Sequence, residues 1–142
     1  MQLSQNFTLK EFTDSEMAAR HGIDNTPPDE LIPALQHLAG GLERVRSLLG
    51  DKPLYISSGY RCPKVNILVG SKPTSQHLLG QAADFKCPAF GSPSQIVRRV
   101  VNSSIPYDQI IIEWSQWVHI SFSEKPRRMA LVIDSTGTRG YA

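Results

Sequence analysis

The sequence predicts an α+β fold with a mostly antiparallel sheet flanked by helices, and two observations favour it. The longest run of helix-like apolar spacing lies in the first half of the chain, at residues 29–49. Three short strand-like segments, 108–113, 117–122 and 129–134, cluster in the second half. Helices followed by strands are typical of the α+β class. The 142 residues, 40% of them apolar, suffice for one core, so we expect a single domain over 1–142.

The N-terminal segment predicts short helices. Residues 7–21 are typical of one or two of them. Thr13 or Asp14 can serve as a cap, because a side-chain oxygen there can accept a hydrogen bond from a free backbone N–H. Gly22 can end the last turn in the left-handed conformation.

The segment 29–49 predicts the longest helix. Pro33 lies near its first turn, where a missing N–H costs least. Gly40 and Gly41 weaken the middle of the helix or let another segment pack close to it. The expected apolar stripe follows steps of three and four residues and consists of Leu31, Leu35, Leu38, Leu42, Val45 and Leu49.

The middle of the chain predicts shorter elements. In order, we expect a strand within 53–61, a helical turn at 63–69, a loop at 70–76, a strand at 82–87 and a helix at 92–104. The last of these helices has the clearest start, because Ser92 can cap it and Pro93 takes the first helical position.

Composition excludes several classes of function. With 15 basic and 13 acidic residues, the net charge of +2 is too balanced to indicate nucleic acid as a partner. No apolar run approaches the ~20 residues of a membrane span, so we expect no stable membrane insertion. The first residues, MQLSQNFTLKEF, do not resemble a signal peptide, so we expect synthesis in the cytoplasm. Cys62 and Cys87 are expected to be free thiols or to form one disulfide.

Three residues are candidate metal ligands. The stretch SQHLLGQAADF contains His77 and Asp84, and the alternating segment WVHISF contains His119. A catalytic zinc ion usually takes three such ligands and one water molecule. Gly80 allows a tight turn between the first two. Taken alone, each histidine is more often a hydrogen-bonded structural residue, so the spacing leaves both interpretations open.

The combination of SGYRCPKVN, SQHLLGQAADF and WVHISF resembles the zinc D-Ala-D-Ala carboxypeptidase family of peptidoglycan peptidases, which is related to the hedgehog signalling domain. The resemblance implies that Zn²⁺ is bound by His77, Asp84 and His119 in a cleft over the sheet. FTLKEF and NTPP are similar to segments of the smaller, phage-associated, endolysin-like members.

The residue that would accept a proton departs from the pattern of many relatives. They have a glutamate three residues before the second histidine, where this chain has Gln116. If 108–113 and 117–122 form a hairpin, Glu113 lies opposite Trp117 and Ile111 opposite His119. Glu113 and His119 then share a face of the sheet. Glu113 is therefore the candidate general base.

Other residues are candidates for binding the substrate. The resemblance implies that Arg61 of SGYR holds the substrate near the zinc, and its guanidinium suits a carboxylate or a developing oxyanion. Ser75 is a candidate hydrogen-bond donor to the substrate. Asn66 is expected to fix a loop, and Asp108 is a candidate support for a ligand histidine.

These residues predict a zinc metallopeptidase that cuts peptidoglycan stem peptides or cross-links. The bond can be D-Ala–D-Ala, a D,D cross-link or L-Ala–D-Glu. Such a protein would reach the cell wall through a pore formed by a holin, or as part of a virion. The alternative is a non-catalytic, zinc-stabilised module that binds wall peptide or a protein, and Gln116 is the residue that favours it.

Overall fold

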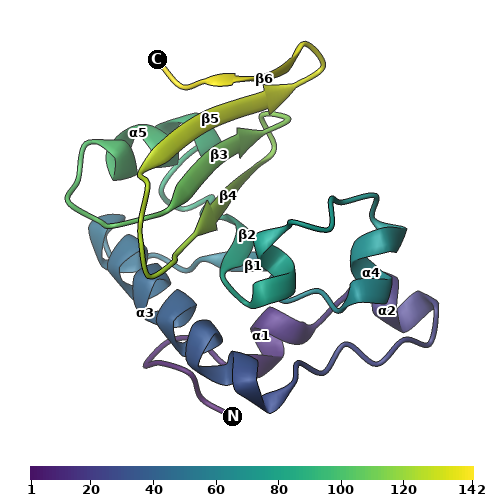
Figure 1. The fold of residues 1–142 in the computed structure, drawn as a ribbon. Coiled ribbons are helices and arrows are strands. Elements are labelled where there is room, and N and C mark those ends of the chain that lie inside the picture. The colour runs from purple at the N-terminus through teal and green to yellow at the C-terminus, as the bar shows by residue number, and fades with distance from the viewer.

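The computed structural model describes residues 1–142 and contains one six-stranded sheet with helices beside and below it (Figure 1). The strands are β1 (Tyr55–Ser58), β2 (Ala82–Lys86), β3 (Gln109–Glu113), β4 (Trp117–Ser121), β5 (Met129–Asp134) and β6 (Gly137–Gly140). Their order across the sheet is β1-β2-β4-β3-β5-β6. Neighbouring strands are antiparallel except for β3 and β5, which are parallel. The predicted α+β class with a mostly antiparallel sheet is confirmed.

The helices lie mostly before the sheet in the chain. They are α1 (Leu9–Thr13), α2 (Glu16–Arg20), the 3₁₀ turn η1 (Asp29–Leu31), α3 (Ile32–Leu48), α4 (Pro63–Leu68), the 3₁₀ turn η2 (Gln76–Leu79) and α5 (Pro93–Val101). The N-cap predicted for the first helices, Thr13 or Asp14, is wrong, whereas Gly22 ends α2 with φ of +62° as predicted. Thr8 caps α1 and Ser15 caps α2, each accepting a hydrogen bond from a backbone N–H of the first turn. The predicted start of α5 is confirmed, because Ser92 accepts from the N–H of Gln95.

Helix α3 supplies much of the core. It passes below the sheet (Figure 1), and its stripe from Leu35 to Leu49 is buried. Each such side chain stabilises the fold by about 1.5–3 kcal/mol. At Gly41 a Cβ atom would lie 2.5 Å from the ring of Phe122, so the ring packs directly on the helix backbone. The close approach predicted for the glycine pair therefore occurs at Gly41, whereas Gly40 faces open space.

The sheet has two different faces. Side chains alternate along each strand, and one face carries buried aliphatic residues that join the core with α3 and α5: Ala83, Phe85, Ile110, Ile112, Val118 and Ile120. The residues between them point to the other face, and they include Asp84, Glu113 and His119. All the candidate residues on strands therefore lie on the face away from the core helices.

Strand β6 was not predicted. Its residues are all exposed and include two glycines, so the segment has no apolar alternation to reveal it. It forms because its backbone pairs with β5, with Asp134 opposite Gly137 and Leu131 opposite Gly140. Gly137 has φ of +108°, a conformation that favours glycine at the turn between the two strands.

Cys62 and Cys87 are free, buried thiols, so the disulfide alternative is wrong. Burial of both side chains agrees with the other alternative left open by the sequence.

None of the helices combines the length and the apolar character needed to cross a membrane.

Candidate metal centre

Two of the candidate ligands lie in one row across the sheet. Asp84 in β2 is paired with His119 in β4, and His119 is paired with Ile111 in β3. Because directly paired residues point to the same face, the carboxylate and the imidazole project together. The Nδ1 atom of His119 lies 3.0 Å from Oδ1 of Asp84. The hairpin register predicted from the sequence, with Glu113 opposite Trp117 and Ile111 opposite His119, is confirmed.

The third candidate ligand comes from η2. Ser75 caps this turn by accepting from the N–H of His77, and Gly80 ends it with φ of +69°. His77 Nδ1 lies 2.6 Å from the carbonyl oxygen of Gly59. That carbonyl can only accept, so Nδ1 carries the proton and Nε2 has a free lone pair. His77 Nε2 faces Asp84 Oδ1 at 3.4 Å.

A glycine is needed at position 59 for the contact between its carbonyl and His77 Nδ1. A Cβ atom at Gly59 would lie 2.6 Å from the carbonyl oxygen of Phe12, so only glycine lets α1 approach so closely. The tight packing of α1 against this turn keeps the Gly59 carbonyl in place to accept from His77 Nδ1. The orientation of the ring is therefore set by the fold around it, as is common for metal-binding histidines.

The donor set of these three residues fits a divalent metal ion. Potential ligand atoms of His77, Asp84 and His119 all lie within 4.8 Å of one another. Two nitrogens and one carboxylate oxygen are the ligands that zinc takes in many catalytic sites. All three residues are buried, with exposed fractions of 3%, 5% and 8%.

Protonation states also suit metal binding, which requires deprotonated ligands. Burial alone would raise the pKa of Asp84, but its contacts with the imidazoles of His119 and His77 outweigh burial, and the pKa lies well below its usual range. Burial lowers the pKa of His77. The carboxylate is thus charged and the His77 ring neutral near neutral pH.

Glu113 and Arg61 are next to this cluster. Glu113 Oε1 lies 3.8 Å from His119 Nδ1. Burial, followed by the nearby charge of Asp84, raises the pKa of Glu113. The Nη2 atom of Arg61 lies 3.5 Å from Asp84 Oδ2, and its Nε donates to Ser58 Oγ at 3.2 Å. A carboxyl group with a raised pKa and a fixed cation therefore flank the three candidate ligands.

A cleft of about 800 Å³ opens onto the cluster. His77, Asp84 and His119 line it together with Arg61, Glu113 and Ser75. All six site residues predicted from the sequence are therefore brought together. Gln116 is not among the lining residues, and its backbone N–H closes the turn by donating to the carbonyl of Glu113. The position occupied by glutamate in many relatives thus lies outside this cleft.

Trp114 is a further residue of the cleft. It lines the cleft with an exposed fraction of 49%. Its φ of +56° is strained for a bulky side chain. Its backbone N–H donates to the carbonyl of Ile133 in β5, which holds the turn in that conformation. The turn between β3 and β4 therefore forms part of the cleft wall.

Asp108 and Asn66 have structural roles. Asp108 does not contact either ligand histidine, so the predicted support is not found there. It binds Gln76 and Arg127 instead. Asn66 is buried, and its amide donates to the carbonyl of Lys72, so the expected fixing of the loop is confirmed. Nothing in the local sequence pattern distinguishes Arg127, which also lines the cleft.

Comparison with protein families agrees with this arrangement. The family model described as peptidase M15 matches residues 5–121, which include all six predicted site residues. A search of curated proteins finds no match to the chain. Peptidases of the M15 family are metal-dependent, which agrees with the donor set assembled by η2, β2 and β4. The match covers most of the chain, and the protein therefore belongs to the peptidase M15 family, the D-Ala-D-Ala carboxypeptidase-like metallopeptidases.

Proposed function

We propose that the protein is a zinc-dependent peptidase that hydrolyses a peptide bond in peptidoglycan stem peptides or cross-links. One observation carries the proposal: His77, Asp84 and His119 converge on the same open cleft as Glu113. Such a donor set suits a metal ion that activates water, and a carboxylate beside it can accept the proton of that water.

His77 Nε2, His119 Nδ1 and a carboxylate oxygen of Asp84 would hold the zinc ion. When bound, zinc supplies Lewis acidity, which polarises the scissile carbonyl and lowers the pKa of water. The Gly59 carbonyl keeps His77 in the tautomer that presents Nε2. The three ligands are themselves buried at the base of the site, with exposed fractions of 3%, 5% and 8%.

Glu113 is the proposed general base. Its carboxylate lies on the face of the sheet that carries His119, and the two side chains approach to 3.8 Å. A pKa raised by burial lets Glu113 accept a proton from water and then donate it to the leaving amine. Gln116 lies outside the cleft, so the amide at that position does not argue against catalysis.

Arg61 and Ser75 are proposed to bind the substrate. Arg61 uses Nε and Nη2 towards Ser58 and Asp84, which leaves N–H groups for a substrate carboxylate or the developing oxyanion. The Ser75 oxygen accepts from the His77 backbone, so its hydroxyl hydrogen remains available to donate to the substrate.

The proposal includes three bonds: D-Ala–D-Ala, a D,D cross-link and L-Ala–D-Glu. The resemblance to phage-associated members extends the proposal to a lysis or tail protein, delivered through a holin pore or in a virion. The alternative is a zinc-stabilised module that binds without cutting. Gln116, the residue that favoured it in the sequence, lies outside the cleft, and the position of Glu113 in the cleft argues against it.

Mass spectrometry of purified peptidoglycan after digestion tests the proposal. With zinc, new stem-peptide fragments are expected, whose masses identify the bond, and a chelator should prevent their formation. Bound zinc without release of amino groups would instead support the non-catalytic module.

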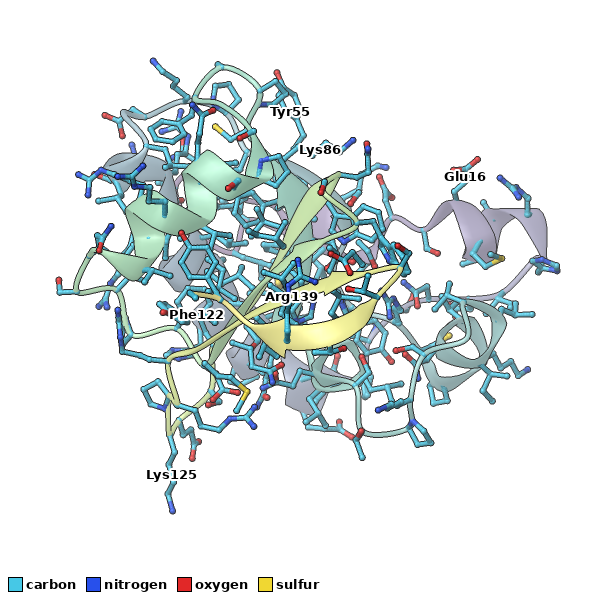
Figure 2. The ribbon with its side chains drawn as sticks, turned by 90° about the horizontal axis from the view of Figure 1, so that it is seen from above. Glu16, Tyr55, Lys86, Phe122, Lys125 and Arg139 are labelled. Atoms are coloured by element: carbon cyan, nitrogen blue, oxygen red, sulfur yellow. The ribbon has the colours of Figure 1, made fainter.

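The Glu113→Gln variant tests the general base. We expect it to keep its zinc and to lose turnover by about 10²- to 10⁴-fold, the usual contribution of general acid–base catalysis. Glu16→Gln is a matched control, because Glu16 lies on α2 at the edge of the molecule (Figure 2) and its side chain is 84% exposed. Retained activity in Glu113→Gln would remove Glu113 from this role.

A further inference from the structure

Arg127 lines the cleft but has no role in the proposed mechanism. It lies in the segment between β4 and β5, and it lines the same cleft as the three candidate metal ligands. Its side chain is 52% exposed, yet it is fixed by a buried partner, Asp108, whose side chain is only 3% exposed. An arginine that is half open to solvent but held by a buried carboxylate is pre-organised to bind something else.

The contacts of Arg127 leave one edge of its guanidinium free. Its Nε donates to Asp108 Oδ1 at 2.9 Å and its Nη2 donates to Asp108 Oδ2 at 2.8 Å. A guanidinium has five N–H groups, so both hydrogens on Nη1 and the second on Nη2 have no partner in the protein. Nη1 and Nη2 together form the edge that binds a carboxylate in a bidentate manner.

Asp108 also links Arg127 to the metal cluster. Its Oδ2 accepts from Gln76 Nε2 at 2.8 Å, and Gln76 immediately precedes His77 in η2. The backbone N–H of Arg127 donates to Asp108 Oδ1 at 3.0 Å. Arg127 and the turn that carries His77 are therefore attached to one buried carboxylate, which keeps the guanidinium at a constant distance from the ligands.

Strand β3 gives the position of Arg127 along the cleft. Ile111 is level with His119, whereas Asp108 lies three residues earlier, ~10 Å along a strand. Glu113, Trp114 and Ile133 line the cleft on the opposite side of Ile111 from Asp108, towards the end of β3. The cleft therefore has a cationic end at Arg127 and a partly apolar end at Trp114.

We propose that Arg127 is a specificity-determining residue that binds a carboxylate of the substrate peptide, away from the bond that is cut. This proposal rests on the proposed function. It narrows the substrate to peptides that carry a free carboxylate ~10 Å from the metal ligands, the separation estimated along the strand. Stem peptides have such groups on D-isoglutamate and at the C terminus, and amidation removes their charge. Acidic peptides are then favoured over amidated ones.

The test uses the zinc-loaded full chain and two pairs of synthetic stem pentapeptides. One pair differs in D-isoglutamate against D-isoglutamine at the second residue, and the other in a free against an amidated C terminus. For at least one pair, wild-type kcat/KM should favour the acid by about 10- to 100-fold, the range expected for hydrogen bonds to a charged group. The preference should lie mainly in KM, because the carboxylate is bound before and during the reaction.

The Arg127→Gln variant should bring this acid-to-amide ratio close to one. Arg127→Lys should lose most of the preference too, because an ammonium paired with Asp108 offers no second edge. Arg139→Gln is the matched control, since Arg139 lies on β6 (Figure 2), pairs with Asp134 and does not line the cleft. The ratio is internal to each variant, so it is insensitive to a partial loss of folded protein.

Calorimetric binding of the same peptides to zinc-loaded Glu113→Gln protein separates this inference from the proposed function. Binding with an acid preference that Arg127→Gln removes, but without cleavage by the wild type, supports Arg127 and contradicts the peptidase. Lys72 is another cationic residue that lines the cleft, so Lys72→Gln serves as a second comparison. Cleavage without an acid preference overturns the role of Arg127 alone. So does a preference that survives in Arg127→Gln or that disappears in Lys72→Gln instead. If the peptides are neither bound nor cleaved, both proposals are overturned.

Discussion

Asp84 and Asp108 are two buried aspartates at one sheet, and they differ in what balances their charge. Asp108 accepts four hydrogen bonds, three from Arg127 and one from Gln76. Asp84 faces two imidazole nitrogens at 3.0 and 3.4 Å, and Arg61 approaches it only to 3.5 Å. One carboxylate is therefore saturated by a guanidinium of the chain, whereas the other faces rings that are neutral unless protonated.

This difference distinguishes a structural carboxylate from a ligating one. A buried charge is tolerated only when it is paired and hydrogen-bonded. The pair of Asp108 is permanent, so it fixes the segments before β3 and β5 relative to η2. The charge of Asp84 instead suits a divalent cation shared with His77 and His119. Substituting each aspartate should therefore affect different properties.

The largest effect is expected for Asp84→Asn on metal affinity. Asparagine has nearly the same shape but no charge, so zinc affinity should fall by more than ~100-fold, the upper value for residues that only support ligands. Competition with a chromogenic chelator measures this. Asp108→Asn is the matched control and should stay close to wild type. Equal affinities of Asp84→Asn and wild type would exclude Asp84 as a ligand.

Zinc should stabilise the wild-type protein, because it binds the folded state in preference to the unfolded one. At a free zinc concentration of 100 times the dissociation constant, the free energy of unfolding should rise by about 2.7 kcal/mol. Urea unfolding with and without a chelator measures the change. The increase should persist in Asp108→Asn and disappear in Asp84→Asn, and an increase in both variants would place the metal elsewhere.

Asp108→Asn should reduce stability without removing zinc. The variant loses hydrogen bonds between a buried carboxylate and a guanidinium, which costs about 2 kcal/mol. The same urea experiment provides the measurement. Asp134→Asn, which weakens the more exposed pair with Arg139, should cost less than about 1 kcal/mol. Similar losses of unfolding free energy in Asp108→Asn and Asp134→Asn would mean that burial of Asp108 does not strengthen its ion pair.

The smallest effect is expected in how the stability difference between wild type and Asp108→Asn depends on pH. Hydrogen bonds from Arg127 keep the pKa of Asp108 far below its usual range in the folded protein. A lowered pKa contributes stability above the unfolded value, about 3.9, and this contribution is lost as the pH falls below it. Between pH 7 and pH 3, the gap between wild type and Asp108→Asn should shrink by about 1 kcal/mol.

Urea unfolding at both pH values, in chelator, measures this gap. Asp84 is present in both proteins, so its own titration cancels in the difference. A gap that is constant, or that widens at low pH, would contradict the lowered pKa of Asp108.

Parts of the fold and site could be predicted because they depend on local rules. Alternation along two adjacent strands, joined by a short turn, gives the register that places Glu113 and His119 on one face. The helix at Ser92 follows from capping chemistry. The close approach at Gly41 shows the limit of such rules, because the sequence does not say which of two adjacent glycines faces Phe122.

Other features depend on contacts that leave no local pattern. Strand β6 is exposed and polar, and it is a strand only because β5 offers an edge. The parallel pairing of β3 and β5 depends on the path of the chain between β4 and β5. Arg127 and Asp108 are 19 residues apart, and charged residues at such a separation show no periodicity that pairs them.

The sequence by itself determined the class of the fold, the face of the hairpin that carries His119 and the identity of the three candidate ligands. It did so because apolar periodicity and motif residues are properties of short segments. Only the tertiary structure decided which buried carboxylate is neutralised by the chain and which is left to imidazoles. That choice depends on distances between η2, β3 and the segment before β5, and packing of the whole sheet sets those distances.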